Sequence, residues 1–486
     1  MLWHIIKREI YDHLTSLRFA LTVGLIALLM VLNGLIFVGS DYEKRLLDYS
    51  QNAAWVADRV KASCEHLNEL AMQGPIGLYK RPNPLAFCAN DQEDALPIRV
   101  QAQGGMGTNE WRTGEAERSY SYKPPWRLEY VQDVYEKNSM IRAFTALDWS
   151  FIIGVAMSFV AILFTFDAIS SERERGTLKL TLSNSVPRGI LLLGKFLGAF
   201  VGVAVPLLMG MILSLLIVTL SGFVSLDAGN WARIGLMVAI SFIYISLFIG
   251  LGLAVSSRAR HSSTSLLALL LIWVVLVVLV PNTLGSVVST LRKVPSQREF
   301  RQQKDTTMGA LGRDMDYLFK YGSPTQPNPD IRAIQLMADY VTTRLEAETR
   351  LDDEHIDAQF AQVQLARQIL RTASPAAIYN YAMESLADTG FERHRQFVEA
   401  VRRYRGQFID FIRSADRSDT ESHHIYYLKE GLSGKPVSSD NVPRFVEPTG
   451  AARAFESTLT NLSLLVLFSL IFFLISYVAF LRCDIR

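Results

Sequence analysis

Six long runs of apolar residues, each long enough to cross a lipid bilayer, constrain this chain more than any other feature. A transmembrane helix needs about 20 apolar residues to cross a hydrocarbon core of about 30 Å. Six buried helices in a large soluble protein are the alternative, but such a core does not suit six runs of this length. The sequence therefore predicts an all-α membrane protein with six transmembrane helices. The predicted spans are 19–38, 147–166, 196–220, 234–255, 266–288 and 459–481.

Basic residues beside the short loops indicate how these spans are oriented. Four segments outside the spans carry Lys or Arg near a predicted membrane end, and with six spans all four fall on one side. Short loops rich in Lys and Arg stay cytoplasmic, so both termini are predicted to be cytoplasmic. The residues are Lys7, Arg8, Arg18, Arg173, Arg175, Lys179, Arg188, Arg258, Arg260, Arg482 and Arg486.

Residues 1–18 form a predicted amphipathic helix ahead of the first span. Apolar residues recur every three or four positions opposite Lys7 and Arg8, which is typical of a helix lying in the headgroup plane. An ordinary solvated helix is the alternative. Because Glu9 and Asp12 precede the apolar run and no small-x-small site follows it, a cleaved signal peptide is not expected. The apolar positions are Leu2, Ile5, Ile6, Ile10 and Leu14.

Two large segments, 39–146 and 289–458, are predicted to lie outside the cytoplasm. The first is expected to begin with a helix that prolongs the first span. In the second, Ser374-Pro375 resembles an N-cap with proline at the first helical position, and the helix is predicted to end near Gly390. Several stripes at helical spacing predict a mostly helical domain, and they are more typical of packing seams than of ligand sites. One stripe consists of Phe397, Val401, Tyr404, Phe408 and Phe411.

The three cysteines fall on both sides of the predicted membrane. Cys64 and Cys88 lie in the first external segment, whereas Cys483 lies in the cytoplasmic tail. Because disulfides persist only in an oxidising compartment, we expect one between Cys64 and Cys88. Closing that loop would stabilise it by about 3 kcal/mol on a chain-entropy estimate. Two unpaired buried thiols are the alternative.

Motifs for metal binding and catalysis are incomplete. "CEH" at 64–66 and the pair His423-His424 lack the ligand count of a metal site, so no metal is expected. "GILLLGKF" at 189–196 spells G-x-x-x-x-G-K, but Phe196 stands where a phosphate-binding loop needs Ser or Thr. We expect Lys195 to extend to the cytoplasmic headgroups instead. With no nucleophile-elbow or HExxH motif either, neither a catalytic site nor a cofactor is expected on this chain.

The apolar cores of the six spans contain no Asp, Glu, Lys, Arg or His. Asp148, Asp167 and Lys195 stand only at the edges of spans. Ion-driven carriers place ionisable residues inside the membrane as relays, so an ion-coupled carrier is a poor fit. The energy for any pumping would then come from a partner.

The predicted cytoplasmic loop 167–195 contains "SERERGTLKL", residues 171–180, with five charges in ten positions. A short amphiphilic helix of this kind can engage a soluble partner, because complementary charges across an interface set its register and specificity. A solvated loop held by internal Glu–Arg pairs is the alternative.

The surrounding stretch, "FDAISSERERGTLKLTLSNSVPRGILLLGKFLGAF" at 166–200, resembles the signature region of type V ABC exporter permeases. In that family an acidic residue ends the second span, an "ERE-x-GTL" helix follows, and "R-x-x-x-x-x-GK" opens the third span. Here these features correspond to Asp167, to Glu172 through Leu178, and to Arg188 with Gly194 and Lys195. Six spans and cytoplasmic termini agree with the same family.

Two external stretches resemble, more loosely, a bacterial subgroup with large inserts after the first and fifth spans. They are "YKRPNPLAF" at 79–87 and "SPAAIYNYAMESLADTGFERHRQFVEAVRRYRGQF" at 374–408. Members with this architecture include permeases associated with copper-enzyme maturation, gliding and sodium export. The resemblance thus covers nearly the whole chain without indicating a substrate.

The resemblance implies that 171–180 is a coupling helix seated in a cleft of a separate ATP-hydrolysing subunit. It also implies two such subunits that carry ATP and Mg, and a second permease, identical or related, in the bacterial inner membrane. No nucleic-acid partner is expected. The implied contact residues are Glu172, Arg173, Glu174, Arg175, Thr177, Leu178 and Leu180.

Two functions remain open at this point. The first is a non-catalytic permease that exports a substrate with energy from the partner ATPase. The second is a mechanotransmission protein, in which the same motion moves the external helices without translocating anything.

Overall fold

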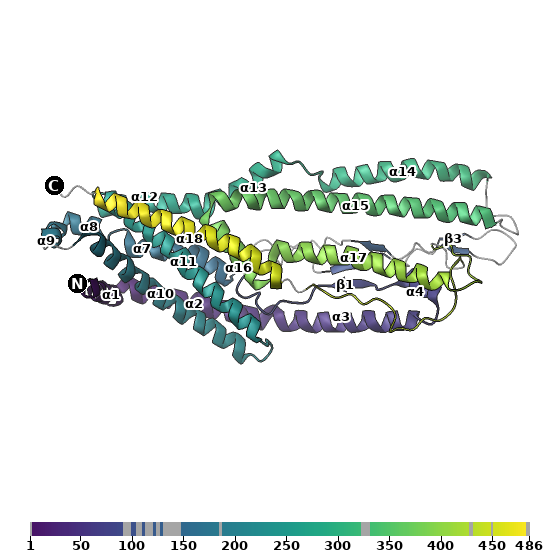
Figure 1. Ribbon diagram of the computed structural model, residues 1–486, viewed down its shortest axis with the longest axis horizontal. Coiled ribbons are helices and arrows are strands. Elements are labelled where there is room, and N and C mark those ends of the chain that lie inside the picture. The colour runs from purple at the N-terminus through teal and green to yellow at the C-terminus, as the bar shows by residue number, and fades with distance from the viewer. Residues whose placement is uncertain are drawn as a thin grey trace.

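The computed structural model shows an elongated molecule with a bundle of apolar helices at one end (Figure 1). Both ends of the chain lie at the tip of this bundle, and the remaining helices extend as a rod from its opposite side. The structure describes residues 2–90, 99–103, 109–111, 120–122, 127–129, 147–183, 187–321, 331–426, 431–448 and 451–482.

Within the described residues, six helical segments are long and apolar enough to cross a membrane. The chain is therefore an all-α membrane protein, as predicted. The segments run over Leu17–Ser63, Trp149–Glu174, Arg188–Leu220, Ala228–Arg258, Ser262–Leu284 and Thr458–Leu481. Their elements are α2 (Leu17–Ile36), η1 (Phe37–Asp41) and α3 (Tyr42–Ser63); α6 (Trp149–Phe151), η3 (Ile152–Met157), α7 (Ser158–Thr165) and α8 (Ser170–Glu174); α10 (Arg188–Leu220); α11 (Ala228–Arg258); α12 (Ser262–Trp273), η4 (Val274–Leu279) and α13 (Val280–Leu291); and α18 (Ala451–Leu481).

The bundle is apolar inside and outside. A single cluster of buried side chains, among them Ile26, Trp149 and Phe248, runs through its interior. Large apolar side chains such as Leu271 and Leu474 are also exposed on its outer surface. A soluble protein rarely exposes continuous apolar patches of this kind, whereas lipid tails cover them in a bilayer.

The rod that extends from the bundle, called the external part from here on for its position outside the bundle, consists mainly of long helices. The predicted extension of the first span is present as α3. The predicted stripe on α17 (Gly390–Arg417) is a packing seam, because Phe397, Tyr404 and Phe408 are buried in a second hydrophobic cluster. The other external helices are α4 (Leu67–Gln73), α14 (Gln297–Tyr321) and α15 (Ile331–Ala373).

Two small antiparallel sheets accompany these helices. In the first sheet the strand order is β1-β2-β5, with Leu78 opposite Val100 and Ala102 opposite Leu128. The second sheet pairs β3 with β4. The strands are β1 (Gly77–Tyr79), β2 (Arg99–Gln103), β3 (Asn109–Trp111), β4 (Tyr120–Tyr122) and β5 (Arg127–Glu129).

The helix predicted after Ser374 is α16 (Pro375–Ala387), and it packs on the membrane bundle rather than on the external rod alone. The Ser374 hydroxyl caps it by accepting a hydrogen bond from the Ala377 amide at 3.2 Å. The ring of Tyr379 stacks on Tyr244 of α11 with centroids 4.4 Å apart, and its hydroxyl lies 3.0 Å from Ser241 Oγ. α16 therefore joins the spans to the external helices.

The predicted disulfide between Cys64 and Cys88 is wrong, because both are free, buried thiols in separate hydrophobic clusters. Cys88 follows Phe87, whose ring lies 5.4 Å from that of Phe37 at the outer end of the first span. Cys64 lies 27 residues farther along a continuous helix, or about 40 Å at 1.5 Å per residue. A disulfide needs Cα atoms within about 7 Å. Cys483 lies outside the described residues.

Candidate functional site

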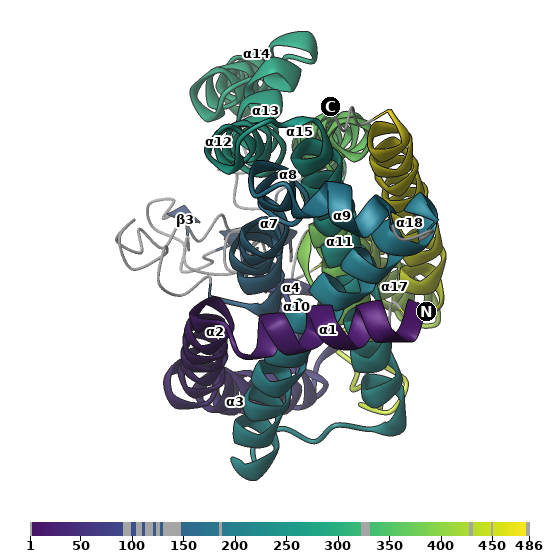
Figure 2. The same cartoon turned by 90° about the vertical axis from the view of Figure 1, so that its left-hand side faces the viewer.

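The charged stretch 171–180 forms two short helices at the end of the bundle where the chain termini lie (Figure 2). α8 ends at Glu174, and α9 (Thr177–Ser183) begins directly after Gly176. Gly176 has a φ of 72°, a left-handed conformation that glycine adopts without steric cost. The Thr177 hydroxyl donates a hydrogen bond to the Glu172 carbonyl oxygen at 3.2 Å, which closes the turn between the two helices.

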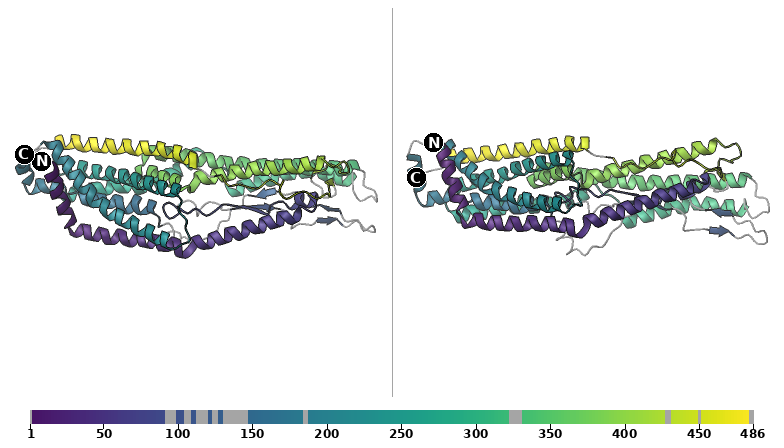
Figure 3. Two further views of the ribbon diagram at one scale, coloured as in Figure 1. Left: turned by 60° about the horizontal axis from the view of Figure 1, so that its bottom comes forward. Right: turned by 90° about the horizontal axis from the view of Figure 1, so that it is seen from below.

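The predicted N-terminal helix, α1 (Leu2–Leu14), crosses this same end of the bundle (Figure 3). It packs directly on the first turns of α10, where glycines recur every four residues. A Cβ at Gly198 would lie 2.5 Å from the Cβ of Glu9, so no larger residue fits without displacing α1. This close backbone approach brings Glu9 to Lys195. The three glycines facing α1 are Gly194, Gly198 and Gly202.

Lys195 forms the centre of a buried charge cluster. Its Nζ lies 3.0 Å from Glu9 Oε1 and 2.8 Å from Glu172 Oε1. The Lys195 side chain is only 3% exposed, against 18% for Glu9 and 28% for Glu172. The expectation that Lys195 extends to the headgroups is therefore wrong, because two carboxylates hold it inside. The cluster ties α8 to both α1 and α10.

Two further contacts fix the ends of this region. Arg18 and Asp167 form a bidentate ion pair, with N···O distances of 3.1 and 2.8 Å. This pair joins the start of α2 to the end of α7. The Glu174 carboxylate accepts hydrogen bonds from the Ser262 amide at 2.8 Å and the Ser262 hydroxyl at 3.1 Å. Because Ser262 begins α12, this carboxylate also complements a helix N-terminus.

His13 completes the contact between α1 and the bundle. Its ring lies against Phe164, with centroids 5.4 Å apart. Burial lowers the pKa of His13, so the ring is neutral at neutral pH and packs as part of the apolar contact.

The residues predicted to contact an ATPase divide into two groups. Leu178 is only 1% exposed and belongs to the bundle core. Glu172 and Glu174 are bound to the chain's own Lys195 and Ser262, and Arg173 donates to the Ala259 carbonyl oxygen at 3.3 Å. Four members of the predicted set are exposed, namely Glu174, Arg175, Thr177 and Leu180, and Lys179 is exposed beside them.

The roles of Glu9 and Lys195 were missed by sequence reasoning. Glu9 stands on the predicted interfacial helix, and Lys195 directly follows Gly194 in the "GKF" stretch. Glycines spaced by four residues at 194, 198 and 202 were the available signal, since small residues at this spacing allow close helix crossing.

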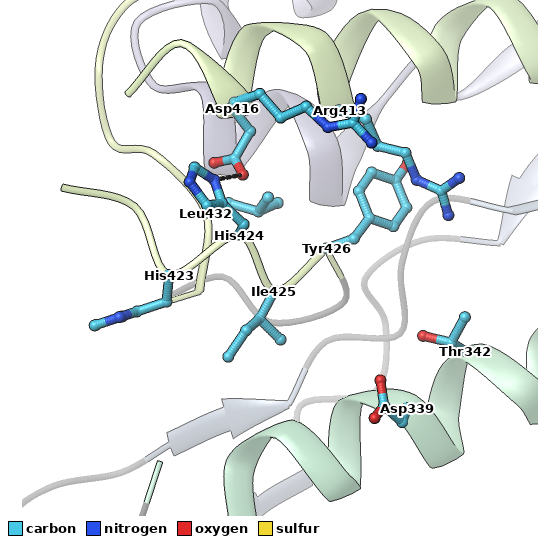
Figure 4. Close-up of a pocket in the computed structure, with 10 residues that line it drawn as sticks. Asp339, Thr342, Arg413, Asp416, His423, His424, Ile425, Tyr426 and Leu432 are labelled. Carbon is cyan, nitrogen blue, oxygen red and sulfur yellow. Dashed lines mark hydrogen bonds and ion pairs between the residues drawn. The ribbon is translucent and has the colours of Figure 1, made fainter. Parts of the chain in front are cut away.

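A polar pocket of about 480 Å³ lies in the external part, between α15 and the end of α17 (Figure 4). Buried Asp416 is 2.8 Å from His424 Nδ1, whereas His423 lies apart from this pair. Arg413 lies over the ring of Tyr426 at 5.2 Å. Among the residues that the structure describes, no group of three or more His, Cys, Asp or Glu is placed to hold a metal ion. The pocket therefore has a histidine–aspartate pair but no recognisable metal ligand set.

The chain belongs to the ABC-2 family of transporter proteins, whose family model matches residues 3–485. Together with its six candidate membrane spans, this match makes the chain a multi-pass membrane protein of a transporter family. One relative is the probable ABC transporter permease protein NosY of Pseudomonas aeruginosa, 34% identical over 126 residues. The match covers 25% of this chain and 45% of the relative, so the chain spans less than half of that protein's length.

Proposed function

We propose that this protein is the non-catalytic transmembrane subunit of a type V ABC exporter in a bacterial inner membrane. Two ATPase subunits hold ATP and Mg on the cytoplasmic side, where both termini of this chain also lie. A second permease, identical or related, completes the path. ATP-driven closure of the ATPase subunits moves α8 and α9, and this motion switches access to a path between the permeases.

The surface formed by α8 and α9 carries this proposal. Its exposed side chains include Arg175, Thr177, Lys179 and Leu180, which present two cations, a hydroxyl and an apolar group beside the exposed carboxylate of Glu174. Leu180 is 68% exposed, which suits a side chain that enters a partner's cleft. A partly buried ion pair to Lys195 and an exposed pair of hydrogen bonds to Ser262 connect α8 to other helices of the bundle. Force applied to α8 and α9 therefore reaches α1 and α10 through Lys195, and α12 through Ser262.

Co-purification of the complete chain with its ATPase tests this proposal. We expect Arg175→Glu combined with Leu180→Asp to reduce captured ATPase at least 30-fold, since losing one buried interfacial partner costs about 2–5 kcal/mol. Membrane insertion should stay normal, because both side chains are exposed. Arg301→Glu on α14 is the matched control for an exposed charge reversal and should leave capture unchanged. Wild-type capture and ATP hydrolysis by the double variant would exclude the proposed docking surface.

The position of α16 favours mechanotransmission as a second candidate. α16 is buried against the spans and continues through a tight turn into α17, with Asp388 at a φ of 55° and Gly390 at 77°. Motion of α11 can therefore be passed to the external rod. Reconstitution with the ATPase in liposomes separates the candidates: substrate-stimulated hydrolysis with measurable transport supports export. ATP-dependent movement of the external helices without any transport supports mechanotransmission.

A further inference from the structure

An apolar groove of about 390 Å³ runs along α3, outside the membrane bundle. Seven residues of α3 line it. Apart from the charged Asp58 and Lys61, the other five recur at spacings of four, three, one and three, which places them on one face of the helix. Ala53 and Ala57 are exposed in this face and leave room above the backbone. The residues of α3 in question are Tyr49, Ala53, Val56, Ala57 and Val60.

The opposite wall is also largely apolar. Tyr404 of α17 is buried, and its hydroxyl donates to the Pro443 carbonyl oxygen at 3.1 Å. The ring of Phe445 lies against Tyr404, with centroids 5.7 Å apart. Side chains around β1 complete this wall. Because its aromatic groups are held by their own contacts, the groove is formed without a ligand. The other residues of this wall are Pro75, Gly77, Leu78, Tyr79, Ser439 and Val442.

The groove begins a short distance beyond the end of the first membrane span. α3 continues the first span through η1 as one bent helix (Figure 3). Tyr49 lies eight residues beyond Asp41, about 12 Å along the axis, and the groove then follows α3 to Lys61 for about another 18 Å. Its volume falls within the range of small-molecule sites, about 300–1,000 Å³. The groove is therefore an elongated apolar site that begins close to the outer membrane surface.

Charges occur on only three of the side chains that line the groove, namely Asp58, Lys61 and Arg444. Arg444 also forms an exposed ion pair with Asp440 at 3.8 Å, a contact of the kind that contributes only about 0–1 kcal/mol. Asp58 and Lys61 stand at the end of the groove far from the bundle, and the lining nearer the bundle is apolar. Long amphiphiles match this distribution, with an apolar chain along α3 and an acidic group at the end of the groove that Lys61 lines.

We propose that this groove binds the acyl chain of an acidic amphiphile, such as a fatty acid, on the external side of the membrane. An extended peptide is disfavoured because its backbone needs a row of hydrogen-bonding partners, whereas β1 contributes only three residues to the groove. The proposal rests on the groove alone and does not depend on coupling to an ATPase.

Photolabelling of the complete chain in lipid nanodiscs with a diazirine-bearing hexadecanoate tests whether the groove binds an acyl chain. We expect labelled peptides from α3 and from 439–445 in addition to label on the lipid-facing spans. Ala57→Trp fills the groove and should reduce groove labelling at least tenfold. Ala54→Trp is the matched control, because Ala54 is also exposed on α3 but does not line the groove. Equal groove labelling in both variants would overturn the proposal.

Competition defines the chemistry of the ligand. Octanoate, decanoate, dodecanoate and tetradecanoate should displace the probe with affinity rising about fourfold per methylene. Replacing both Lys61 and Arg444 by Ala should weaken competition by dodecanoate but not by dodecanol. Displacement by apolar peptides but not by any fatty acid would overturn the proposal and assign the groove to a peptide. Normal ATPase capture alongside a failed groove test would leave the proposed permease function intact.

Discussion

Replacing Lys195 by Met tests whether the buried charge cluster holds α1 and α8 on the bundle. The substitution keeps much of the side-chain volume but removes the ammonium between Glu9 and Glu172. Two carboxylates, 3.0 and 2.8 Å from the lost Nζ, then face each other without a cation. Their repulsion should push α1 away from α10.

The structure sets the size of this effect. Removing one partner of a buried ion pair costs about 3–5 kcal/mol, because the remaining charge stays buried and uncompensated. Glu9 and Glu172 are 18% and 28% exposed, so water reaches them in part and the lower end of this range applies. About 3 kcal/mol corresponds to a change of about a hundredfold in the equilibrium for local opening of α1.

Hydrogen exchange followed by mass spectrometry on the complete chain in nanodiscs measures this opening. Amides of α1 should exchange about a hundredfold faster in Lys195→Met than in wild type. Lys7→Met removes a positive charge from the exposed face of the same helix and should leave the exchange rates unchanged. The triple variant Glu9→Gln, Lys195→Met and Glu172→Gln removes all three charges and should return to within about tenfold of wild type.

Unchanged exchange of α1 in Lys195→Met would contradict this prediction, because it would mean that the ion pairs do not hold α1 on the bundle. Equally fast exchange of α1 in the single and triple variants would exclude carboxylate repulsion as the cause of the opening. That result would mean that lost packing, and not carboxylate repulsion, loosens the helix.

Three further predictions follow from close packing, free thiols and a buried histidine. Gly198→Leu should displace α1 and expose it to trypsin, because a Cβ there meets Glu9 at 2.5 Å; Gly235→Leu, in open space on α11, should not change digestion. Cys64 and Cys88 should both be alkylated after denaturation without reductant, and a peptide pair linked through them would contradict the structure. Burial lowers the pKa of His394 from 6.5 to about 3, so below pH 6.5 the unfolded state takes up a proton that the folded state does not. Thermal stability of the external part should therefore fall between pH 6.5 and 3 by up to about 1.4 kcal/mol per pH unit, and His394→Gln should flatten this dependence.

Local information in the sequence was sufficient for the spans and for several helix ends. A run of about 20 apolar residues in a bilayer must be helical, because lipid offers no partner for backbone N–H and C=O groups. The limits of α16 were likewise predictable, since Ser374 caps it and Pro375 suits its first turn. The stripe through Phe397 and Tyr404 marked the buried face of α17 for the same reason, which is that helical spacing is a local property.

Partners across the fold could not be predicted in this way. Cys64 and Cys88 share a compartment by sequence, but the length of α3 separates them by far more than a disulfide can bridge. The composition of "SERERGTLKL" indicated a charged surface. In the structure, however, Glu172 pairs with Lys195 and Leu178 is buried in the bundle core, whereas Arg175 and Leu180 are exposed.

Apolar length and periodicity act over neighbouring residues, so they were enough to predict the membrane class, the helices and the charged stretch between the second and third spans. The position of Lys195 between Glu9 and Glu172, in contrast, depends on how the helices pack. That contact depends on α1 crossing α10 over glycines, and a crossing between helices distant in sequence arises only when the whole bundle packs.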